Sequence, residues 1–329
     1  CGFFSTTSLA LRNDYVQAVC RELALRRDYL QGASVETIYF GGGTPSQLSL
    51  RQLAVLFDAI YNIYNVRARE ITVECNPDDV GRTEGHENFL AGLRRLGVNR
   101  LSMGVQTFDD DRLRFLHRRH TAKQAVSAVT QAQSAGFDNI SIDLMFGFPG
   151  QTLPSWRQDV DKALTLNVQH LSAYSLMYEE GTKLERMVAD GELAEIADEQ
   201  SHAMYEYLLD ATAEKGFTHY EISNFAQPGC QSRHNSGYWH GVPYLGVGAG
   251  AHSFDGKVRQ HNADDLLAYI RGGEKGLYPS EQEVLTPAEQ YDEFVFTALR
   301  TRQGLNLQML NQRFGTDFLR NGTSQEEKR

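Results

Sequence analysis

The chain has 329 residues, of which 41% are hydrophobic and 22% charged, and its formal net charge is −10 at pH 7. This composition is typical of a globular protein, and the length allows one large domain or two ordinary ones. The negative charge argues against wholesale nucleic-acid binding, which depends on Lys and Arg neutralising phosphates, and no apolar run reaches the roughly 18 residues that a transmembrane segment needs.

Helices and strands alternate through the first half of the chain. The predicted strands cover residues 37–40, 71–74, 101–105, 140–146 and 171–177. The predicted amphipathic helices cover residues 14–29, 49–64, 86–96, 121–135 and 153–166. Ser49 is the expected N-cap of the second helix, and Gly97 and Gly136 are expected to close two others. This alternation predicts an α/β fold in which helices flank a parallel sheet.

Polar and glycine-rich segments lie at the carboxyl ends of several predicted strands. They are the loop 41–45, Glu74, Gln106 and the turn 147–150. Barrels build their active sites at these strand ends, whereas a flat doubly wound sheet gathers them at one switch point. The distribution therefore favours a barrel over a flat sheet.

The alternation stops after about Gly181. Three further helices are predicted, at residues 197–214, 263–271 and 287–302, and the stretch 219–254 is rich in loops, aromatic residues, His and Gly. We therefore divide the chain into a barrel unit, residues 1–180, and an α+β accessory region, residues 181–329.

Four cysteines are spread along the chain, at Cys1, Cys20, Cys75 and Cys230. Their spacing does not form a disulfide framework, which favours a reducing cytoplasm. Cys20 falls on the apolar face of the first helix, so a packing role is expected there, and Cys75 is expected to pack as well.

The loop Gly41-Gly42-Gly43-Thr44-Pro45 follows directly after a predicted strand. Glycines let backbone groups approach a ligand closely, although a tight strand-to-helix turn has the same composition. The loop lacks the spacing of a dinucleotide-binding or P-loop fingerprint.

Two carboxylates stand at unusual positions, Glu74 at the end of one predicted strand and Asp143 within another, apolar one. Glu74 ends one strand, where it could bind ribose hydroxyls or an ammonium group, or simply cap a turn. Asp143 interrupts the apolar strand 140–146, and a buried carboxylate is costly unless it is paired or used. Asp143 is therefore predicted to serve function.

The segment His234-Asn235-Ser236-Gly237-Tyr238-Trp239 combines a histidine with aromatic residues. Such a set suits a flat aromatic ligand or an iron ion. A packed aromatic corner that anchors the accessory region is the alternative.

Six short motifs, in this order, resemble those of the radical S-adenosylmethionine proteins related to oxygen-independent coproporphyrinogen III oxidase. The resemblance runs from residue 1 to about residue 302, and the ordered set is far more specific than any single member. The motifs are Cys-Gly-Phe at 1–3, Gly-Gly-Gly-Thr-Pro at 41–45, Glu-Cys-Asn-Pro at 74–77, Gly-Val-Gln-Thr-Phe at 104–108, Asp-Leu-Met-Phe-Gly-Phe-Pro-Gly-Gln at 143–151 and His-Asn-x-x-Tyr-Trp at 234–239.

The resemblance implies a partial (β/α)6 barrel, a [4Fe–4S] cluster and S-adenosylmethionine. Cys1 matches the third cysteine of the family's Cys-x-x-x-Cys-x-x-Cys motif, whose three thiolates hold the cluster. The first two cysteines and the first barrel strand are then expected upstream of Cys1, and part of the C-terminal module is expected to be missing. With one cysteine, the chain alone should not hold a stable cluster.

The resemblance also assigns residues to the S-adenosylmethionine site. The loop residues Gly42, Gly43 and Thr44 would contact the cofactor through backbone and hydroxyl groups. The family's other cofactor-binding positions correspond here to Glu74, Gln106, Arg118 and Asp143.

Two functions from different classes follow, an enzyme and a carrier. The enzyme would act as a coproporphyrinogen dehydrogenase in porphyrin biosynthesis, and its substrate would be a porphyrinogen. The carrier would bind haem, with His234 as the candidate iron ligand, and deliver it to an unidentified acceptor protein. Phe3 stands where the oxidases have a further cysteine, and the motif around His234 is typical of the haem-chaperone paralogue, so the sequence favours the carrier. A third alternative is a fragment that does nothing alone.

Overall fold

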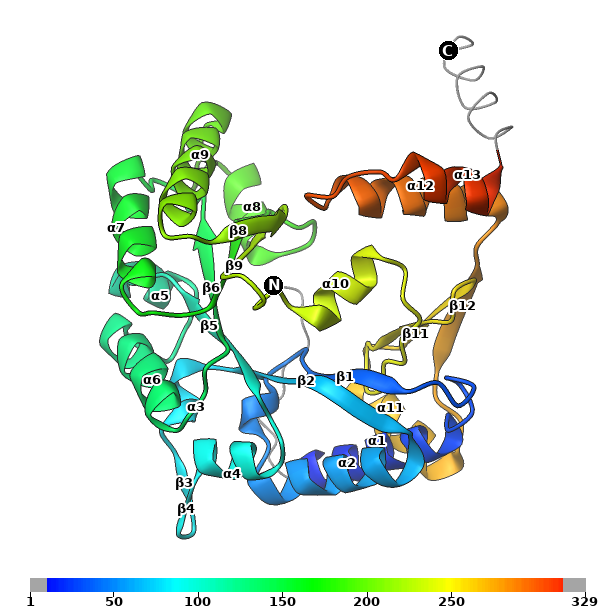
Figure 1. The fold of residues 1–329 in the computed structure, drawn as a ribbon. Helices are drawn as coiled ribbons and strands as arrows, with labels where there is room; N and C mark the ends of the chain where they lie inside the picture. The colour runs from blue at the N-terminus through cyan, green and yellow to red at the C-terminus, as the bar shows by residue number, and fades with distance from the viewer. Residues whose placement is uncertain (1–10, 316–329) are drawn as a thin grey trace.

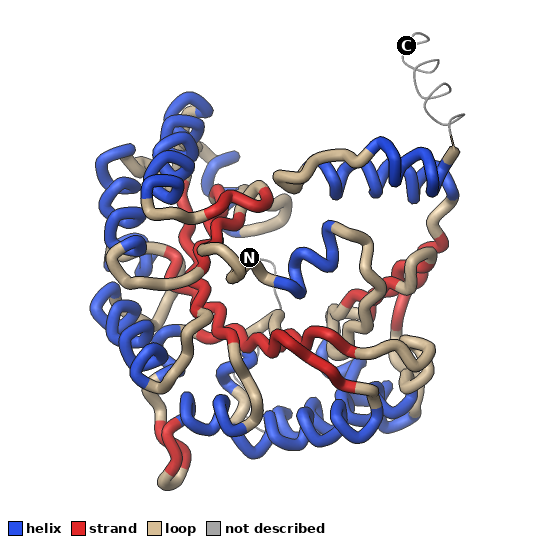
Figure 2. The backbone as a smooth tube through the Cα atoms, in the orientation of Figure 1, coloured by secondary structure: helices blue, strands red, loops and turns tan. Residues whose placement is uncertain are grey.

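The computed structural model describes residues 11–315. It is organised around one sheet of seven strands, which curls around the interior of the molecule (Figures 1 and 2). The strand order is β1-β2-β5-β6-β7-β9-β8, parallel from β1 to β7 and antiparallel at β9 and β8. These strands are β1 (Val35–Phe40), β2 (Val66–Cys75), β5 (Arg100–Gln106), β6 (Ile140–Phe146), β7 (His170–Ser175), β8 (Thr218–Glu221) and β9 (Asn224–Ala226).

Helices cover the outer, convex face of this sheet, and its inner face is left to an interior helix, α10 (Arg233–Trp239) (Figure 1). The arrangement confirms the predicted α/β partial barrel. The longer outer helices are α1 (Leu11–Leu25), α2 (Leu50–Ile63), α6 (Ala122–Ser134), α7 (Leu153–Leu164) and α9 (Asp198–Glu214). Shorter elements of the barrel half are η1 (Pro45–Gln47), α3 (Pro77–Val80), β3 (Thr83–Glu84), β4 (Glu87–Asn88), α4 (Phe89–Arg95), α5 (Asp110–Phe115) and α8 (Lys183–Ala189).

Local sequence signals explain where the helices begin. Ser49 caps α2 by accepting a hydrogen bond from the Gln52 backbone N–H, and the Gln52 side chain accepts from Ser49 in return. Thr121 and Gln124 form the same reciprocal cap at α6. Such capping boxes satisfy two backbone donors that a helix start leaves unpaired. The predicted role of Ser49 is confirmed.

The helix predicted at residues 86–96 is shorter than expected. It begins at Phe89, because the side chain of Asn88 accepts hydrogen bonds from the backbone N–H groups of Leu90 and Ala91. The preceding residues form the small hairpin β3–β4 instead. The periodicity found the apolar face of α4 but missed this cap.

The stretch 219–254, expected to be mostly loops, contains three short strands, β8, β9 and β10 (His252–Phe254), and one helix, α10. Strands β8 and β9 extend the barrel sheet beyond β7, so the accessory region contributes to the same sheet. The division at residue 180 stays a prediction. Beyond α10 the accessory elements are β10, β11 (Val258–Asn262), α11 (Leu266–Lys275), β12 (Ser280–Val284), α12 (Pro287–Leu299) and α13 (Leu307–Phe314).

The hydrophobic core lies between the sheet and the outer helices, with Trp156 of α7 completely buried in it. A second cluster joins α1 and α2 to Tyr269 of α11. Cys75 is buried in the main core, which confirms its packing role, and Cys20 lies half-buried against the second cluster. Within residues 11–315, no helix is both long and apolar enough to cross a membrane.

A buried carboxylate, Glu22 of α1, ties the accessory region to the barrel half. It accepts hydrogen bonds from the backbone N–H of Gly248 (2.9 Å), the side-chain amide of Asn262 (2.8 Å) and the hydroxyl of Tyr269 (2.6 Å). Arg26, one turn further along α1, forms an ion pair with it at 3.3 Å. The Glu22 side chain is only 1% exposed, so each of these bonds replaces water that the carboxylate has lost.

We predict that Glu22→Ala lowers the free energy of unfolding by about 3–5 kcal/mol, the usual cost of removing one partner from a buried ion pair. Urea unfolding monitored by circular dichroism measures this. Gln17→Ala, at an exposed position of the same helix, is the matched control and should change stability by less than about 0.5 kcal/mol. An equally small change in Glu22→Ala would contradict the anchoring role.

Candidate functional site

The glycine loop that follows β1 has the backbone conformation that its sequence suggests. Gly42 and Gly43 both have positive φ angles, +73° and +65°, and no atom of residues 11–315 lies within 4 Å of where a Cβ would be. A Cβ on Gly41, in contrast, would lie 2.3 Å from the Tyr39 ring and 2.9 Å from Glu74 Oε1. The loop therefore needs Gly41 for packing, and it leaves an open cradle over Gly42 and Gly43.

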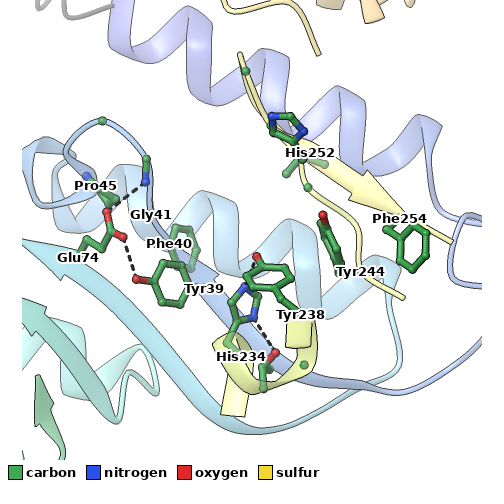
Figure 3. A pocket seen from close by; sticks show the side chains of 18 of the residues that line it. Tyr39, Phe40, Gly41, Pro45, Glu74, His234, Tyr238, Tyr244, His252 and Phe254 are labelled. Carbon is green, nitrogen blue, oxygen red and sulfur yellow. Dashed lines mark hydrogen bonds between the residues drawn. The ribbon is translucent and has the colours of Figure 1, made fainter. Parts of the chain in front are cut away.

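Glu74 connects this loop to β2. One carboxylate oxygen accepts a hydrogen bond from the Tyr39 hydroxyl at 2.8 Å, and the other accepts from the Gly42 backbone N–H at 3.1 Å (Figure 3). Burial raises the pKa of Glu74 above its ordinary value, while these two hydrogen bonds oppose the rise. The carboxylate is thus held at the mouth of the glycine loop, where it can accept from an ammonium or hydroxyl group.

Gln106 ends β5 in an unusual conformation. Its φ is +70°, a region that residues other than glycine rarely adopt, and the β5–β6 register shifts between Met103 and Gln106. A Cβ on Gly104 would lie 2.9 Å from the amide nitrogen of Gln106 and 3.5 Å from Arg118 Nη1. Gly104 therefore leaves room for both the amide and the guanidinium, and Arg118 donates to Asn76 Oδ1 at 3.1 Å. Strain of this kind often marks a functional position.

Asp143 lies on β6, inside the curve of the sheet. It accepts a hydrogen bond from the Ser102 hydroxyl at 3.4 Å. Burial, together with the negative charge of Glu74, raises the pKa of Asp143 to about 7. Among the described residues no Lys or Arg forms an ion pair with Asp143 or Glu74. Arg118 lowers the pKa of Asp143 through its charge but forms no ion pair with it, so the two carboxylates suit a positively charged or proton-donating group.

The structure brings all seven predicted residues of the cofactor site to one cavity of about 4240 Å³. Ordinary small-molecule sites occupy roughly 300–1,000 Å³, so this cavity has room for more than one ligand. The seven residues are Gly42, Gly43, Thr44, Glu74, Gln106, Arg118 and Asp143.

His234 lines another part of the same cavity, in the first turn of α10 (Figure 3). Its Nδ1 is hydrogen-bonded to the Thr37 hydroxyl at 2.8 Å and its Nε2 to the Tyr238 hydroxyl at 2.8 Å. The imidazole stacks on Tyr39, with ring centroids 4.8 Å apart and an interplanar angle of 16°. Burial lowers the pKa of His234 to about 4, so the ring is neutral at pH 7. A neutral imidazole is the form that binds a metal.

Three residues of this region were missed by sequence reasoning, namely Thr37, Tyr39 and Asn76. Thr37 and Tyr39 alternate along β1 on the face that meets His234, and they lie just before the glycine loop. The period-2 pattern of a strand that leads into a ligand loop could have indicated both. Asn76, which accepts a hydrogen bond from Arg118, belongs to the motif Glu-Cys-Asn-Pro at 74–77, but the sequence did not indicate a role for it.

The predicted cluster ligand, Cys1, lies outside the described residues. The cysteines of residues 11–315 are Cys20, Cys75 and Cys230, and none of them belongs to a group of three or more His, Cys, Asp or Glu side chains that could hold a metal. The described part of the chain therefore brings the residues predicted to bind the cofactor to one cavity, while their role and the cluster motif remain predictions from the sequence.

Comparison with known proteins defines the class. The model of the Radical SAM superfamily matches residues 1–163, and that of the HemN C-terminal domain matches residues 285–320. The chain belongs to the radical SAM superfamily. Membership implies a [4Fe–4S] cluster and S-adenosylmethionine, and the open glycine cradle with its carboxylate, amide and guanidinium groups fits the second of these.

Within the superfamily, the similarity points to one kind of protein. The chain is 37% identical to the heme chaperone HemW of Bacillus subtilis (strain 168) over 306 residues, which is 92% of this chain and 79% of that protein. It is also 37% identical to the heme chaperone HemW of Lactococcus lactis subsp. lactis (strain IL1403) over 323 residues, 97% of this chain and 83% of that one.

A solved structure shows the same fold. Coproporphyrinogen III oxidase (HemN) from Escherichia coli, a radical SAM enzyme, matches with a TM-score of 0.79 at 24% identity, covering 95% of this chain and 75% of that one. This likeness concerns the fold, and it bears out the predicted barrel with an accessory region.

We predict that Asp143→Asn removes part of the pH dependence of stability. A carboxyl whose pKa is raised in the fold is most stabilising when protonated, so wild-type stability should fall as the pH rises from the ordinary value of 3.8 through about 7. Urea unfolding at pH 5 and pH 8 should show a smaller fall in the variant. Asp138→Asn, an exposed residue before the same strand, should keep the wild-type fall. Identical pH profiles for Asp143→Asn and wild type would contradict the burial argument.

Proposed function

We propose that this protein is a cytoplasmic haem carrier that binds haem in the cavity beside His234 and passes it to an acceptor protein. The observation that carries the proposal is a neutral imidazole on the wall of a large cavity, stacked on Tyr39 and flanked by Tyr238. Aromatic rings of this kind suit a flat macrocycle. Similarity to heme chaperones HemW over most of the chain supports it.

Iron binding would use Nε2 of His234. Its present partner, the Tyr238 hydroxyl, belongs to a residue that is 38% exposed. Tyr238 in turn packs edge-on against Tyr244, with ring centroids 4.7 Å apart. Turning of Tyr238 would free the nitrogen lone pair and leave an aromatic wall beside the macrocycle.

S-adenosylmethionine would occupy the other part of the cavity. Arg118 suits its carboxylate group, and the carboxylates of Glu74 and Asp143 suit its ammonium group or ribose hydroxyls. The backbone of Gly42 and Gly43 would receive it closely, beside the hydroxyl of Thr44. Bound to a reduced cluster, this cofactor supplies radical chemistry, and the residues named here hold and orient it.

A second candidate is an oxygen-independent coproporphyrinogen III oxidase, which would be an enzyme acting on a porphyrinogen. The fold shared with HemN across 95% of the chain favours it. Phe3, where the oxidases are expected to have a cysteine, and the motif around His234 count against it. In both cases residues 1–180 would form the cofactor unit and residues 181–329 the region that adapts the cavity to its ligand.

We predict that His234→Ala weakens haem binding by about 100-fold or more, because even the hydrogen-bonding partners of a metal ligand are worth roughly 10–100-fold in affinity. Titration of the chain with haemin, followed by the Soret band, measures the loss. His202→Ala, whose side chain is 72% exposed on α9, is the control and should bind as the parent does. Unchanged affinity and an unchanged spectrum in His234→Ala would overturn the iron-ligand assignment.

A further inference from the structure

Two residues that face each other across β1 and β2 both hold His234. Thr37 and Glu70 are paired in register in the parallel ladder. Thr37 Oγ1 is 2.8 Å from the ring nitrogen Nδ1 of His234, while Glu70 Oε1 accepts a hydrogen bond from the His234 backbone N–H at 2.9 Å. Thr37 on β1 therefore holds the ring of His234, and Glu70 on the neighbouring strand β2 holds its backbone.

Glu70 binds the whole beginning of α10 and is only 4% exposed. Besides His234, it accepts hydrogen bonds from the Arg233 backbone N–H at 2.9 Å and from the Ser232 hydroxyl at 3.4 Å. Ser232 Oγ also caps the helix by accepting from the Asn235 N–H at 3.2 Å. A buried carboxylate is stable only with its hydrogen bonds made, so Glu70 allows α10 one position on the sheet.

Thr37 lies against Nδ1 of His234, so its hydroxyl is placed to accept a hydrogen bond from Nδ1–H. When the Thr37 hydroxyl accepts a hydrogen bond from Nδ1–H, the neutral ring carries its lone pair on Nε2. Nε2 is the nitrogen on the Tyr238 side, which is the exposed side. Metal-binding histidines commonly donate their second ring nitrogen to such an acceptor, which sets the tautomer and the ring orientation.

We propose that Thr37 and Glu70 are positioning residues for His234: Thr37 accepts a hydrogen bond from Nδ1–H when iron binds Nε2, and Glu70 sets the backbone from which the ring projects. This inference rests on the proposed function, since it concerns the haem-binding role of His234. Neither residue touches the macrocycle in it. Both act through the histidine.

The test is a haemin titration of four variants, combined with visible and electron paramagnetic resonance spectra of the complexes. Thr37→Val keeps the shape of the side chain but loses the hydroxyl, and it should bind haemin about tenfold more weakly, with an altered iron spectrum. Thr37→Ser restores the hydroxyl and should restore both. Thr72→Val is the matched control on β2, because the buried Thr72 hydroxyl has no hydrogen-bond partner in the part of the chain that the structure describes. It should match the parent in affinity and spectrum.

The fourth variant, Glu70→Gln, replaces one of two acceptor oxygens with a donor and should also weaken binding, so it tests the inference independently if Thr37→Val does not fold. Parental affinity and spectrum in folded Thr37→Val, or in folded Glu70→Gln, would overturn the role of that residue. Equal losses in Thr37→Val and Thr37→Ser would overturn the hydroxyl's role as well. His234→Ala separates failure of the proposed function from failure of the positioning inference. If His234→Ala binds haemin as the parent does, the proposed function is wrong. If His234→Ala loses haemin binding, the other variants test only the positioning roles of Thr37 and Glu70.

Discussion

Buried carboxylates that accept backbone N–H groups from distant segments hold the two halves of this protein together. Glu22 of α1 binds Gly248, and Glu70 of β2 binds His234, over separations of 226 and 164 residues. Such a charge is tolerated away from water only when all its hydrogen bonds are made. These hydrogen bonds therefore fix the position of the accessory segments on the barrel. The accessory segments form part of the cavity wall, so their position also determines the shape of the cavity.

Much of the barrel was predictable because its signals are local. Strand and helix alternation, together with caps such as Ser49, depend on residues within a few positions of one another. Asp143 was recognised because the cost of a carboxylate in an apolar strand is independent of topology. The short strands β8 and β9 were not predicted, since three or four residues carry little periodicity and their pairing with β7 is decided by the rest of the sheet.

The supporting residues of the site were beyond the reach of sequence patterns. Thr37 and His234 are separated by 197 residues, and no motif links them. Tyr39 is similar, because its significance lies in two contacts at once: its hydroxyl binds Glu74 and its ring stacks on His234. The residue types that contact ligands follow from chemistry, whereas those that orient them follow only from the fold. In the cavity, β1 is the element that both ligand regions share.

The close packing around Gly41, directly after β1, predicts the effect of mutations in the glycine loop. Every missense change at a glycine codon adds at least a Cβ, and here that atom would meet the Tyr39 ring at 2.3 Å and the Glu74 carboxylate at 2.9 Å. A displaced Tyr39 would lose its place against His234 on the far side of its ring. A single substitution at Gly41 is therefore expected to weaken two functions at once, the binding of the cofactor and the binding of haem. A Cβ on Gly42 would meet no atom of the described residues within 4 Å, so a substitution there would act through its positive φ angle and its hydrogen bond to Glu74 instead.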